Sequence, residues 1–443
     1  MSREATRHFN DAVRRDPKAA FDQWRRLQDA FHDRSITFNG RPMPTFLRPQ
    51  FVDAATFTAL TRGANILVPL AERVARHAFG GDLEALLEFL QAPESHRRML
   101  RLLPKGPDVA LSRVDGFLDA QGGVRFIEIN SDAPAGFGYA ERMTQVFSEL
   151  PLVRAMRRSD HMEVVGSVDA LLDELRRQAG LERPRVAIVD LRTVKTRPDQ
   201  EILRDEFAAR GVDTLLCDPR DMTIIGDRLV AHDAPVDVVY RRTVIAEVLE
   251  IEAEAPAFFE AYSRRLAVFV NSFRCYLSED KAFFALLTDE RFAGLVSPEE
   301  RAFIDAHIPS TRRMESRKTS LRGEVVDLVP HVEALREAFV LKPSHGYGGA
   351  SVLVGATVDK ATWTAAVQRA ASEPGWIVQE RVEIPEEEFP VFDDAGDLRF
   401  ESLKVNTNPF YVGGAAVGAV TRVSRDAVIN VSAGGGSVPT FVA

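Results

Sequence analysis

Two strand-like runs joined by a glycine turn constrain this chain more than any other feature. Segment 113–134 reads RVDGFLDAQGGVRFIEINSDAP, with apolar and polar residues alternating on either side of the turn sequence at 121–123. Such a pattern predicts a β-hairpin. Alternate residues of a strand lie on one face of the sheet, and a hairpin places two such rows side by side. The residues that we expect on this common face are Arg113, Asp115, Glu128 and Asn130.

The chemistry of these four side chains is that of a site for metal-bound nucleotide phosphates. Two carboxylates and an amide oxygen suit Mg²⁺, which is usually held by a few carboxylates, phosphate oxygens and water. The guanidinium adds a fork-shaped donor for phosphate. The alternative is an amphipathic hairpin whose polar residues face water. The polar run at 130–134, which closes on a proline directly after an apolar strand, favours the site.

Length and charge bound the class of protein. A chain of 443 residues is too long for one simple core, so we expect two or three lobes. A net charge of -9 argues against a nucleic-acid partner. Cys217 and Cys275 are the two cysteines, which indicates neither a disulfide framework nor a zinc site. Because the sequence shows neither a signal-peptide pattern nor a long apolar run, we expect a cytoplasmic protein without a membrane partner.

The pattern of elements changes along the chain. Residues 1–105 are expected to be mostly helical, residues 244–270 helical again, and the basic segment 310–324 a turn-prone connector. Strand-like runs at 186–190, 212–217, 228–231 and 236–240, with a helix at 199–210, suggest a small parallel α/β unit. Further strands are expected at 338–343, 351–355, 376–382, 397–407 and 416–423, with a helix at 360–373.

A second informative segment, FVLKPSHGYGGASVLVG, begins at Phe339. An expected strand delivers Lys342, and the following turn contains Gly346, Gly348 and Gly349. Glycines permit positive φ and close backbone approach to a ligand, and backbone N–H groups in such turns can hold phosphate oxygens. The segment is neither a P-loop nor a dinucleotide fingerprint, because it lacks Gly-Lys-Ser/Thr and opens no helix. A plain glycine hairpin with a surface lysine is the alternative.

Weaker signals lie elsewhere in the second half of the chain. Gln379 and Glu380 belong to a run whose backbone can meet an adenine edge, although an ordinary edge strand is the simpler account. Lys281 opens an expected helix, where a solvated lysine needs no function. Arg422 ends a glycine-rich run and is a candidate clamp for phosphate or carboxylate. His345 lies in the glycine turn, but no Ser or Cys nucleophile with a base can be argued from spacing.

Taken in order, these motifs resemble the glutathionylspermidine synthase-like enzymes, a circularly permuted branch of the ATP-grasp ligases. The resemblance consists of R-x-D followed by E-x-N-x-D-x-P, Asp-Lys at 280–281, K-P-x-x-G-x-G-G at 342–349, Q-E-R-V at 379–382 and G-x-x-x-R ending at Arg422. It covers roughly residues 105–443. It implies an α+β (α/β) permuted ATP-grasp fold in which the metal carboxylates precede the lysines.

The sequence pattern and the resemblance together predict how the chain is divided. A helical N-terminal region with the metal and phosphate hairpin would occupy 1–165, and a small α/β unit similar to a pre-ATP-grasp domain 166–270. A nucleotide-binding subdomain with the glycine-rich loop would follow at 271–385. Strands at 386–443 would return to the ATP-grasp core.

Residue by residue, the resemblance implies that Asp115, Glu128 and Asn130 hold Mg²⁺. Arg113 would stabilise the transferring phosphoryl group, and Arg422 would face an acyl phosphate. The residues that would bind ATP are Lys281, Lys342, Gly346, Gly348, Gly349, Gln379, Glu380 and Val382. Glutathione synthetase relatives place a metal-binding glutamate in the glycine loop, where this chain has His345-Gly346. A third carboxylate is therefore absent or comes from elsewhere.

These inferences predict an ATP- and Mg²⁺-dependent carboxylate–amine (or carboxylate–thiol) ligase that forms its product through an acyl phosphate. Small-molecule or peptide acids and amines would be its substrates. One alternative is a phosphotransferase on the same fold. Another is a nucleotide-binding partner protein without turnover, against which the intact Arg113, Glu128, Asn130 and Lys342 argue. Neither the identity of the acid and amine nor the oligomeric state follows from the sequence.

Overall fold

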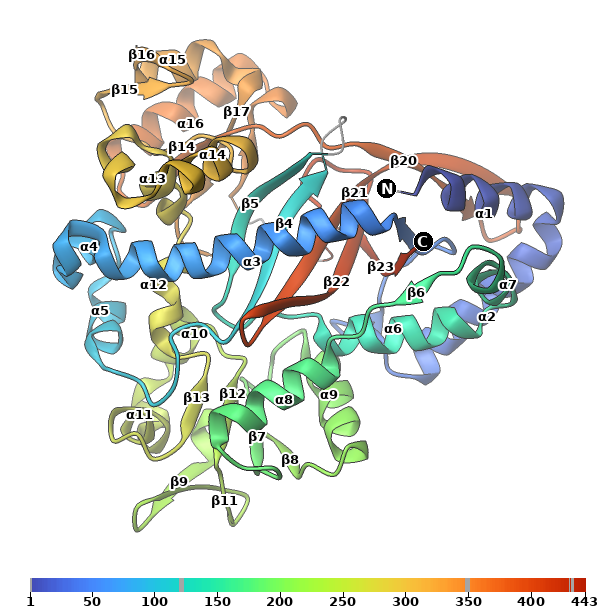
Figure 1. Cartoon of the computed structure of the whole chain (residues 1–443), viewed down its shortest axis with the longest axis horizontal. Helices are drawn as coiled ribbons and strands as arrows, with labels where there is room; N and C mark the ends of the chain where they lie inside the picture. Colours follow the sequence, from blue (N-terminus) through green and yellow to red (C-terminus); the bar gives the residue numbers. More distant parts are fainter. Residues whose placement is uncertain (1, 119–122, 347–350, 430, 432–433) are drawn as a thin grey trace.

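The computed structural model describes residues 2–118, 123–346, 351–429, 431 and 434–443. Two residues of the expected turn at 121–123 fall outside this set, as do Gly348 and Gly349 of the expected glycine turn. Three lobes meet at a central sheet, one at the upper left of Figure 1, one below it and one at the right. This mixed α/β architecture confirms the fold class that the sequence predicts.

The central sheet combines the predicted hairpin with the last strands of the chain. Its strand order is β3-β23-β22-β21-β4-β5, while β20 pairs with β21 and β6 pairs with β23. The strands are β3 (Gln50–Val52), β4 (Leu111–Leu118), β5 (Val124–Asn130), β6 (Glu163–Val164), β20 (Glu386–Phe392), β21 (Leu398–Val412), β22 (Ala415–Ser424) and β23 (Gly436–Val442). Because β21 pairs with β4, strands from both halves of the chain form one surface.

Two helices pack closely on this sheet. Helix α3 (Ala54–His77) lies across the sheet (Figure 1) and contacts β21 and β22. It buries apolar residues at helical spacing, which include Leu60, Ala64, Leu67 and Ala71. Gly63 allows the close approach, because a Cβ there would lie 2.4 Å from the ring of Phe126 on β5. From helix α6 (Phe137–Glu149), Phe137 stacks on Phe410 of β21 with ring centroids 4.0 Å apart.

The upper lobe contains a second sheet with the order β14-β19-β17-β18. Its elements are β14 (Thr311–Arg313), β17 (Phe339–Pro343), β18 (Leu353–Val354), β19 (Trp376–Glu380), the hairpin β15 (Lys318–Leu321) and β16 (Glu324–Asp327), and helices α15 (Leu328–Ala334) and α16 (Lys360–Ser372). Trp363 of α16 is fully buried, and its indole N–H donates to the Val332 carbonyl of α15 at 3.0 Å. The predicted strands at 338–343 and 376–382 and the helix at 360–373 are confirmed.

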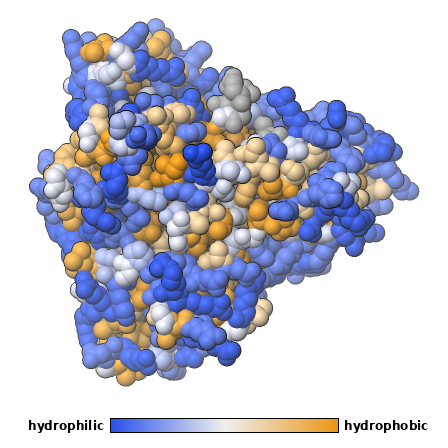
Figure 2. All heavy atoms as spheres, viewed as in Figure 1, coloured by the Kyte–Doolittle hydropathy of each residue, from blue (hydrophilic) through white to orange (hydrophobic). Residues whose placement is uncertain are grey.

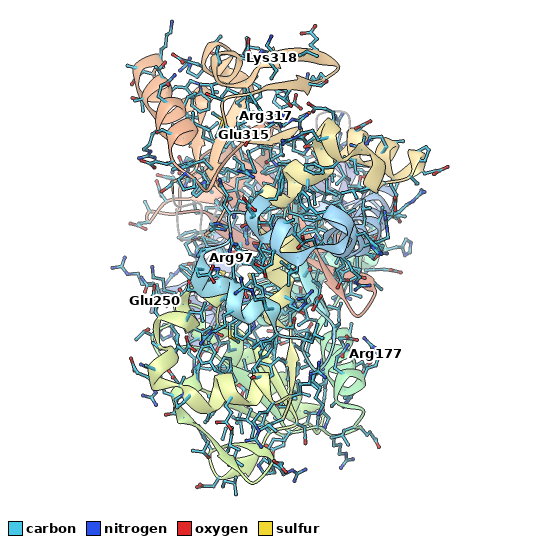
Figure 3. The ribbon with its side chains drawn as sticks, turned by 90° about the vertical axis from the view of Figure 1, so that its left-hand side faces the viewer. Arg97, Arg177, Glu250, Glu315, Arg317 and Lys318 are labelled. Carbon is cyan, nitrogen blue, oxygen red and sulfur yellow. The ribbon has the colours of Figure 1, made fainter. Side chains whose placement is uncertain are left out.

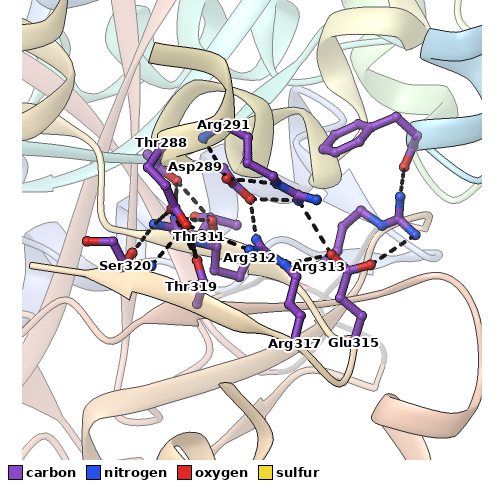
Figure 4. A network of polar contacts seen from close by, with 12 residues as sticks. Thr288, Asp289, Arg291, Thr311, Arg312, Arg313, Glu315, Arg317, Thr319 and Ser320 are labelled. Atoms are coloured by element: carbon purple, nitrogen blue, oxygen red, sulfur yellow. Dashed lines mark hydrogen bonds and ion pairs between the residues drawn. The ribbon is translucent and has the colours of Figure 1, made fainter. Parts of the chain in front are cut away.

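The prediction of a turn-prone connector at 310–324 is wrong, since this segment supplies β14, β15 and the start of β16. Three of its arginines, Arg312, Arg313 and Arg317, contact other parts of the protein, as Figure 4 shows. Arg312 is buried and donates from Nε to Thr319 Oγ1 at 2.8 Å, while Arg317 pairs with the buried Asp289. Polar side chains enter a sheet when partners satisfy them, and a pattern based on polarity misses such strands.

The lower lobe holds the predicted parallel α/β unit. Its sheet has the order β13-β12-β7-β8, and the three pairings are parallel. The elements are β7 (Val186–Val189), β8 (Thr214–Cys217), β12 (Val238–Arg241), β13 (Val268–Val270), α8 (Val168–Ala179), α9 (Arg197–Ala209), α10 (Ile245–Glu250) and α11 (Pro256–Ser263).

Two predictions for this lobe need correction. The run at 228–231 belongs to a separate antiparallel sheet of β9 (Met222–Ile225), β10 (Arg228–Ala231) and β11 (Ala234–Pro235). A two-residue turn with Gly226 at φ +62° joins β9 to β10, and so short a connection requires antiparallel pairing. The stretch expected to be helical over 244–270 contains the helices α10 and α11 and the short turn η3 (Glu252–Glu254), but it ends in a strand. Residues 268–270 complete the parallel sheet as β13, a strand too short for its periodicity to be recognised.

The remaining helices are α1 (Arg3–Arg15), α2 (Pro17–Asp33), α4 (Leu83–Phe89), α5 (Glu94–Arg101), α7 (Pro151–Ser159), α12 (Tyr276–Glu279), α13 (Ala282–Thr288) and α14 (Pro298–His307). Short elements are strands β1 (Thr37–Phe38) and β2 (Arg41–Pro42) and the 3₁₀ turns η1 (Ala78–Gly81), η2 (Pro219–Asp221), η3 (Glu252–Glu254), η4 (Phe273–Cys275), η5 (Glu290–Leu295), η6 (Arg336–Ala338) and η7 (Gly355–Thr357). Figure 2 shows apolar residues gathered over the middle of this face, with hydrophilic rims on the lobes. Among the described helices, none combines the length and apolarity needed to cross a bilayer.

Candidate active site

Strands β4 and β5 form the predicted hairpin, and their register places the predicted residues opposite one another. Arg113 lies opposite Asn130, and Asp115 lies opposite Glu128. The Arg113 guanidinium donates from Nε to Asp115 Oδ1 at 2.6 Å and from Nη2 to Asp115 Oδ2 at 3.0 Å. Both side chains are buried, so this bidentate pair is largely shielded from water.

A second arginine reaches the same carboxylate from β22. Arg422 donates from Nη1 to Asp115 Oδ2 at 3.1 Å. Burial by itself would raise the pKa of Asp115, but the positive charges of Arg113 and Arg422 outweigh it and lower that pKa. Burial and the like charge of Arg113 lower the pKa of Arg422. The three side chains carry one net positive charge inside the protein, an arrangement suited to an anionic ligand.

Lys342 is the last residue but one of β17 and is buried between that strand and the hairpin. Its ammonium donates to Gln379 Oε1 at 2.8 Å, and Gln379 Nε2 donates to the Ile127 carbonyl of β5 at 3.3 Å. Burial lowers the pKa of Lys342 to about 8, while the negative charges of Glu128 and Asp115 oppose that shift. The second sheet and the central hairpin therefore meet at this lysine, close enough for the hairpin carboxylates to act on it.

Lys281 approaches the hairpin from the turn before α13. Its Nζ lies 3.8 Å from Glu128 Oε2 and donates to the Gly346 carbonyl at 2.7 Å. The Lys281 backbone N–H also donates to the Ser344 carbonyl at 3.2 Å. Gly346 has φ +103°, which agrees with the prediction that a glycine is needed there. Lys281 thus joins Glu128 of the first half of the chain to the beginning of the glycine-rich segment.

Glu380 and Val382 stand apart from this cluster. The Glu380 carboxylate accepts from Arg322 Nε at 2.6 Å and from the Ser310 N–H at 3.2 Å, and its own N–H donates to the Ser310 carbonyl at 2.9 Å. Val382 follows the end of β19 and is half-buried. The Glu380 side chain and N–H therefore bond the segment that leads into β14, at the end of the internal strand β19, and the ATP-binding role predicted for these two residues stays a prediction.

Glu279, which sequence reasoning missed, supports the loop after β5. Its Oε2 accepts from the Ser131 N–H at 2.6 Å and from the Asp132 N–H. Asp132 in turn pairs with the buried Arg241 at the end of β12 and accepts from the Ile245 N–H at 2.7 Å. Burial and the charge of Asp132 raise the pKa of Glu279 to about 8. These contacts lock the loop between the hairpin and the parallel α/β unit.

Two asparagines of β21, also missed, support the register shift that follows Asp115. Asn406 Nδ2 donates to the Gly116 carbonyl at 2.5 Å, and the Gly116 N–H donates to Asn408 Oδ1 at 3.2 Å. Asn408 Nδ2 then donates to Asn406 Oδ1 at 2.6 Å. A bulge re-aims the neighbouring side chains of a strand, and here the neighbour is Asp115. Two asparagines separated by one residue in a strand-like run are the sequence signal for this support.

His345 is fixed to the α12–α13 turn. Its ring contacts Asp280 and the Tyr276 hydroxyl through Nδ1, and its Nε2 lies 3.2 Å from the Gln91 carbonyl. Burial alone would lower the pKa of His345, but the charge of Asp280 raises it. This histidine therefore anchors the backbone beside Lys281.

The donors on the hairpin fit Mg²⁺ chemically. Asp115 and Glu128 face each other and Asn130 adds an amide, which matches the preference of Mg²⁺ for few carboxylates and additional phosphate and water oxygens. Within the described ranges, no group of three or more His, Cys, Asp or Glu side chains forms a metal cage. A site of this kind would need ligand phosphates to complete the coordination.

Comparisons with known proteins identify the family of this chain. Residues 89–424 match the family described as circularly permuted ATP-grasp type 2. An uncharacterized protein of Mycobacterium tuberculosis is 25% identical over 444 residues, covering 94% of this chain and 77% of its own. A Frankia casuarinae protein, provisionally named a glutamate–cysteine ligase, is 23% identical, and the match spans 93% of this chain but 49% of that protein.

A solved structure shares the architecture over nearly its full length. The apo form of a glutathione synthetase-like effector, GSS30, from Globodera pallida superposes with a TM-score of 0.66 at 11% identity, covering 97% of this chain and 98% of its own. At that identity the likeness concerns the fold alone. Because the family match extends over most of the sequence, this chain belongs to the circularly permuted ATP-grasp type 2 family.

Proposed function

We propose that this protein is an ATP- and Mg²⁺-dependent carboxylate–amine ligase. One observation carries the proposal: the acidic hairpin of the first half of the chain meets Lys281 and Lys342 of the second half around one buried cluster. Lys281 Nζ lies 3.8 Å from Glu128, and Gln379 bonds both Lys342 and the hairpin backbone. A cluster with surplus arginine and lysine beside two carboxylates suits a metal-bound triphosphate.

The proposed reaction has two steps. A substrate carboxylate oxygen attacks the γ-phosphorus of ATP, and the bond to the ADP oxygen breaks, which gives an acyl phosphate. An amine nitrogen then attacks the acyl carbon, loses a proton and expels phosphate, which leaves an amide. No protein nucleophile is required, so positioning and charge stabilisation supply most of the acceleration.

Each residue of the cluster has a proposed task. Lys281 and Lys342 bind the ATP phosphates, while Arg113 stabilises charge on the phosphoryl group in transfer. Arg422 faces the acyl phosphate from β22. Asp115, Glu128 and Asn130 would hold Mg²⁺, which when bound would neutralise charge on the phosphate oxygens. Asp115 also fixes both arginines, since it bonds each of them.

Product analysis across a panel of amino acids, polyamines and small peptides tests the reaction class. A ligase forms ADP and free phosphate only when an acid and an amine are both present, and hydroxylamine traps its acyl phosphate as a hydroxamate. A phosphotransferase would form ADP without releasing phosphate. Bound ATP with no ADP formed under any amine would identify a binding protein instead.

The variant Glu128→Ala tests the assignment of the site. Glu128 is partly exposed, so its removal should leave the fold intact while abolishing Mg-ATP turnover. Glu260→Ala on α11, a surface change in the lower lobe, is the matched control and should keep full activity. Near-normal ATP consumption by Glu128→Ala would refute the metal assignment.

A further inference from the structure

A pocket of about 590 Å³ opens between the α4–α5 region and strand β14, outside the cluster described above. The residues that matter for its chemistry are Phe79, Glu88, Phe89, Gln91, Arg97 and Arg313. The volume falls within the range of sites for small molecules. In Figure 3 the labelled Arg97 lies on this side of the molecule, below Glu315 and Arg317 of the upper lobe.

One wall of the pocket is aromatic. The rings of Phe79 and Phe89 lie 5.7 Å apart, and both pack against Phe292 at 5.5 and 5.1 Å. Phe79 is half-buried, so part of its ring remains accessible. Its backbone has φ +54°, an unusual conformation for a large side chain, which turns the ring toward this group. Such a wall offers apolar surface to the body of a ligand.

The positive charge in the pocket lining comes from two guanidinium groups, which bond mainly to backbone carbonyls. Arg313 donates from Nη1 to the Phe89 carbonyl at 2.9 Å (Figure 4), and among the described residues its buried Nε has no partner. Arg97 donates from Nε to the Ala92 carbonyl at 3.0 Å. Their carboxylate contacts are long: Arg313 to Glu315 at 3.8 Å and Arg97 to Glu94 at 3.7 Å. Both arginines therefore keep donor capacity for an anion.

We propose that this pocket binds a small carboxylate with an aromatic or other apolar body. The carboxylate would lie between Arg97 and Arg313, because paired guanidinium groups match its geometry and charge. The apolar body would pack on Phe79 and Phe89. The lining carries two cations against one exposed acid, Glu88, so an anion is favoured over a cation. This binding does not depend on the proposed ligase reaction.

Gln91 links the pocket to the nucleotide half of the candidate site. Its side-chain Oε1 accepts from the Gly375 N–H at 2.5 Å, and its carbonyl lies 3.2 Å from His345 Nε2. Gly375 precedes β19, and its carbonyl accepts from the Ser344 N–H at 2.8 Å, just after β17. Gln91 therefore contacts the chain just before β19, which carries Gln379, and just after β17, which carries Lys342. A ligand that contacts Gln91 would touch this junction of the two strands.

Calorimetric titration with 3-phenylpropionate tests the site, with phenethylamine as the probe of opposite charge. We expect 3-phenylpropionate to bind at one site per chain and phenethylamine not to bind. Arg313→Gln and Arg97→Gln should each weaken the affinity about tenfold or more, since each removes charge-assisted bonds. Arg98→Gln is the matched control on the same helix, because Arg98 is 56% exposed and pairs with Glu252 instead.

The outcomes separate the proposal from its rivals. Binding that is lost in Arg97→Gln and Arg313→Gln but kept in Arg98→Gln supports it. If the variant at the half-buried Arg313 fails to fold, Arg97→Gln alone decides. Absence of 3-phenylpropionate binding, preferential binding of phenethylamine, or equal affinity in all three variants overturns it.

The link through Gln91 has its own test, which rests on the proposed nucleotide site. Saturating 3-phenylpropionate should change the Kd for Mg-ATP at least about twofold, and Mg-ATP must change the affinity for 3-phenylpropionate by the same factor. Identical Kd values with and without 3-phenylpropionate would overturn the link. Failure of ATP to bind at all would instead count against the proposed function and leave the carboxylate titration as it stands.

Discussion

The two halves of the candidate site balance their charges in different ways. On the central sheet, Asp115 bonds both Arg113 and Arg422, so these three charges lie within 3.1 Å of an opposite partner. Across from this sheet, Lys342 of β17 bonds a neutral amide at 2.8 Å, and Lys281, just before α13, bonds a carbonyl and lies 3.8 Å from Glu128. The two arginines share a bonded carboxylate, while the two described ammonium groups bond neutral oxygens.

This difference indicates a division of labour. A closed ion network in a buried sheet is rigid, which suits the step in which charge develops at a fixed place. Ammonium groups without close carboxylates gain most from an incoming polyanion, because their desolvation is not yet compensated. The account therefore expects changes on the central sheet to affect chemistry most and changes on the facing sheet to affect nucleotide affinity most.

The largest effect is expected from Arg113→Ala. Removal of an arginine that stabilises phosphoryl transfer typically lowers kcat by about 10³-fold or more. The variant also leaves Asp115 with Arg422 as its remaining guanidinium partner, and breaking a buried pair costs about 3–5 kcal/mol of stability. Fixed-time assays of ADP formation measure the change in kcat, and chemical denaturation measures the loss of stability. A kcat within a few-fold of wild type would remove Arg113 from the reaction.

Lys342→Met should act on affinity and less on the chemical step. Its charge is buried against an amide, so we expect Kd for Mg-ATP to rise about 10- to 100-fold, as for loss of a strong charge-assisted bond. Equilibrium titration with a fluorescent ATP analogue measures this change. If Lys342→Met instead lowered kcat by more than it raised Kd, the proposed division between the two sheets would fail.

The pH dependence of binding sharpens the same point. The pKa of Lys342 is lowered to about 8 by burial, so its protonated form is present below that value and is lost as pH rises through it. Mg-ATP affinity should therefore weaken about tenfold between about pH 7 and about pH 9. Lys342→Arg, whose guanidinium stays charged, should flatten the profile. An equal slope in both proteins would assign the titration to another group.

The smallest effect is expected from Arg322→Ala. Arg322 pairs with Glu380 at the end of β19, and its side chain is 77% exposed. Exposed ion pairs contribute about 0–1 kcal/mol, so Kd for Mg-ATP and the melting temperature should stay close to wild type. A tenfold loss of ATP affinity would show that this end of β19 belongs to the nucleotide half after all.

The sequence predicted the parts of the site that local patterns determine. Strand alternation and a short turn were enough to place Arg113 and Asp115 beside Glu128 and Asn130, because a hairpin is a local structure. The contact between this hairpin and Lys342 was expected from the family resemblance, since no local rule relates segments so far apart.

The missed residues act through tertiary contacts. Glu279 accepts from backbone N–H groups of the loop after β5, and Asn406 and Asn408 bond the backbone of Gly116 on β4. Most of these partners are distant in sequence from the residues that they contact. In the sequence, the residues themselves stand in short polar runs that look like solvated turns. The strand at 268–270 and those within 310–324 were missed for related reasons: one is short, and the others have polar side chains whose partners lie elsewhere in the chain.

Calorimetric titration of the protein with ATP in the presence of Mg²⁺ tests the central claim most directly, with wild type, Glu128→Ala and Lys342→Met compared side by side. If both sheets surround one triphosphate, wild type binds a single nucleotide and each variant weakens that binding by about tenfold or more. Wild-type affinity in either variant would mean that the two sheets do not share a ligand, and would contradict the account.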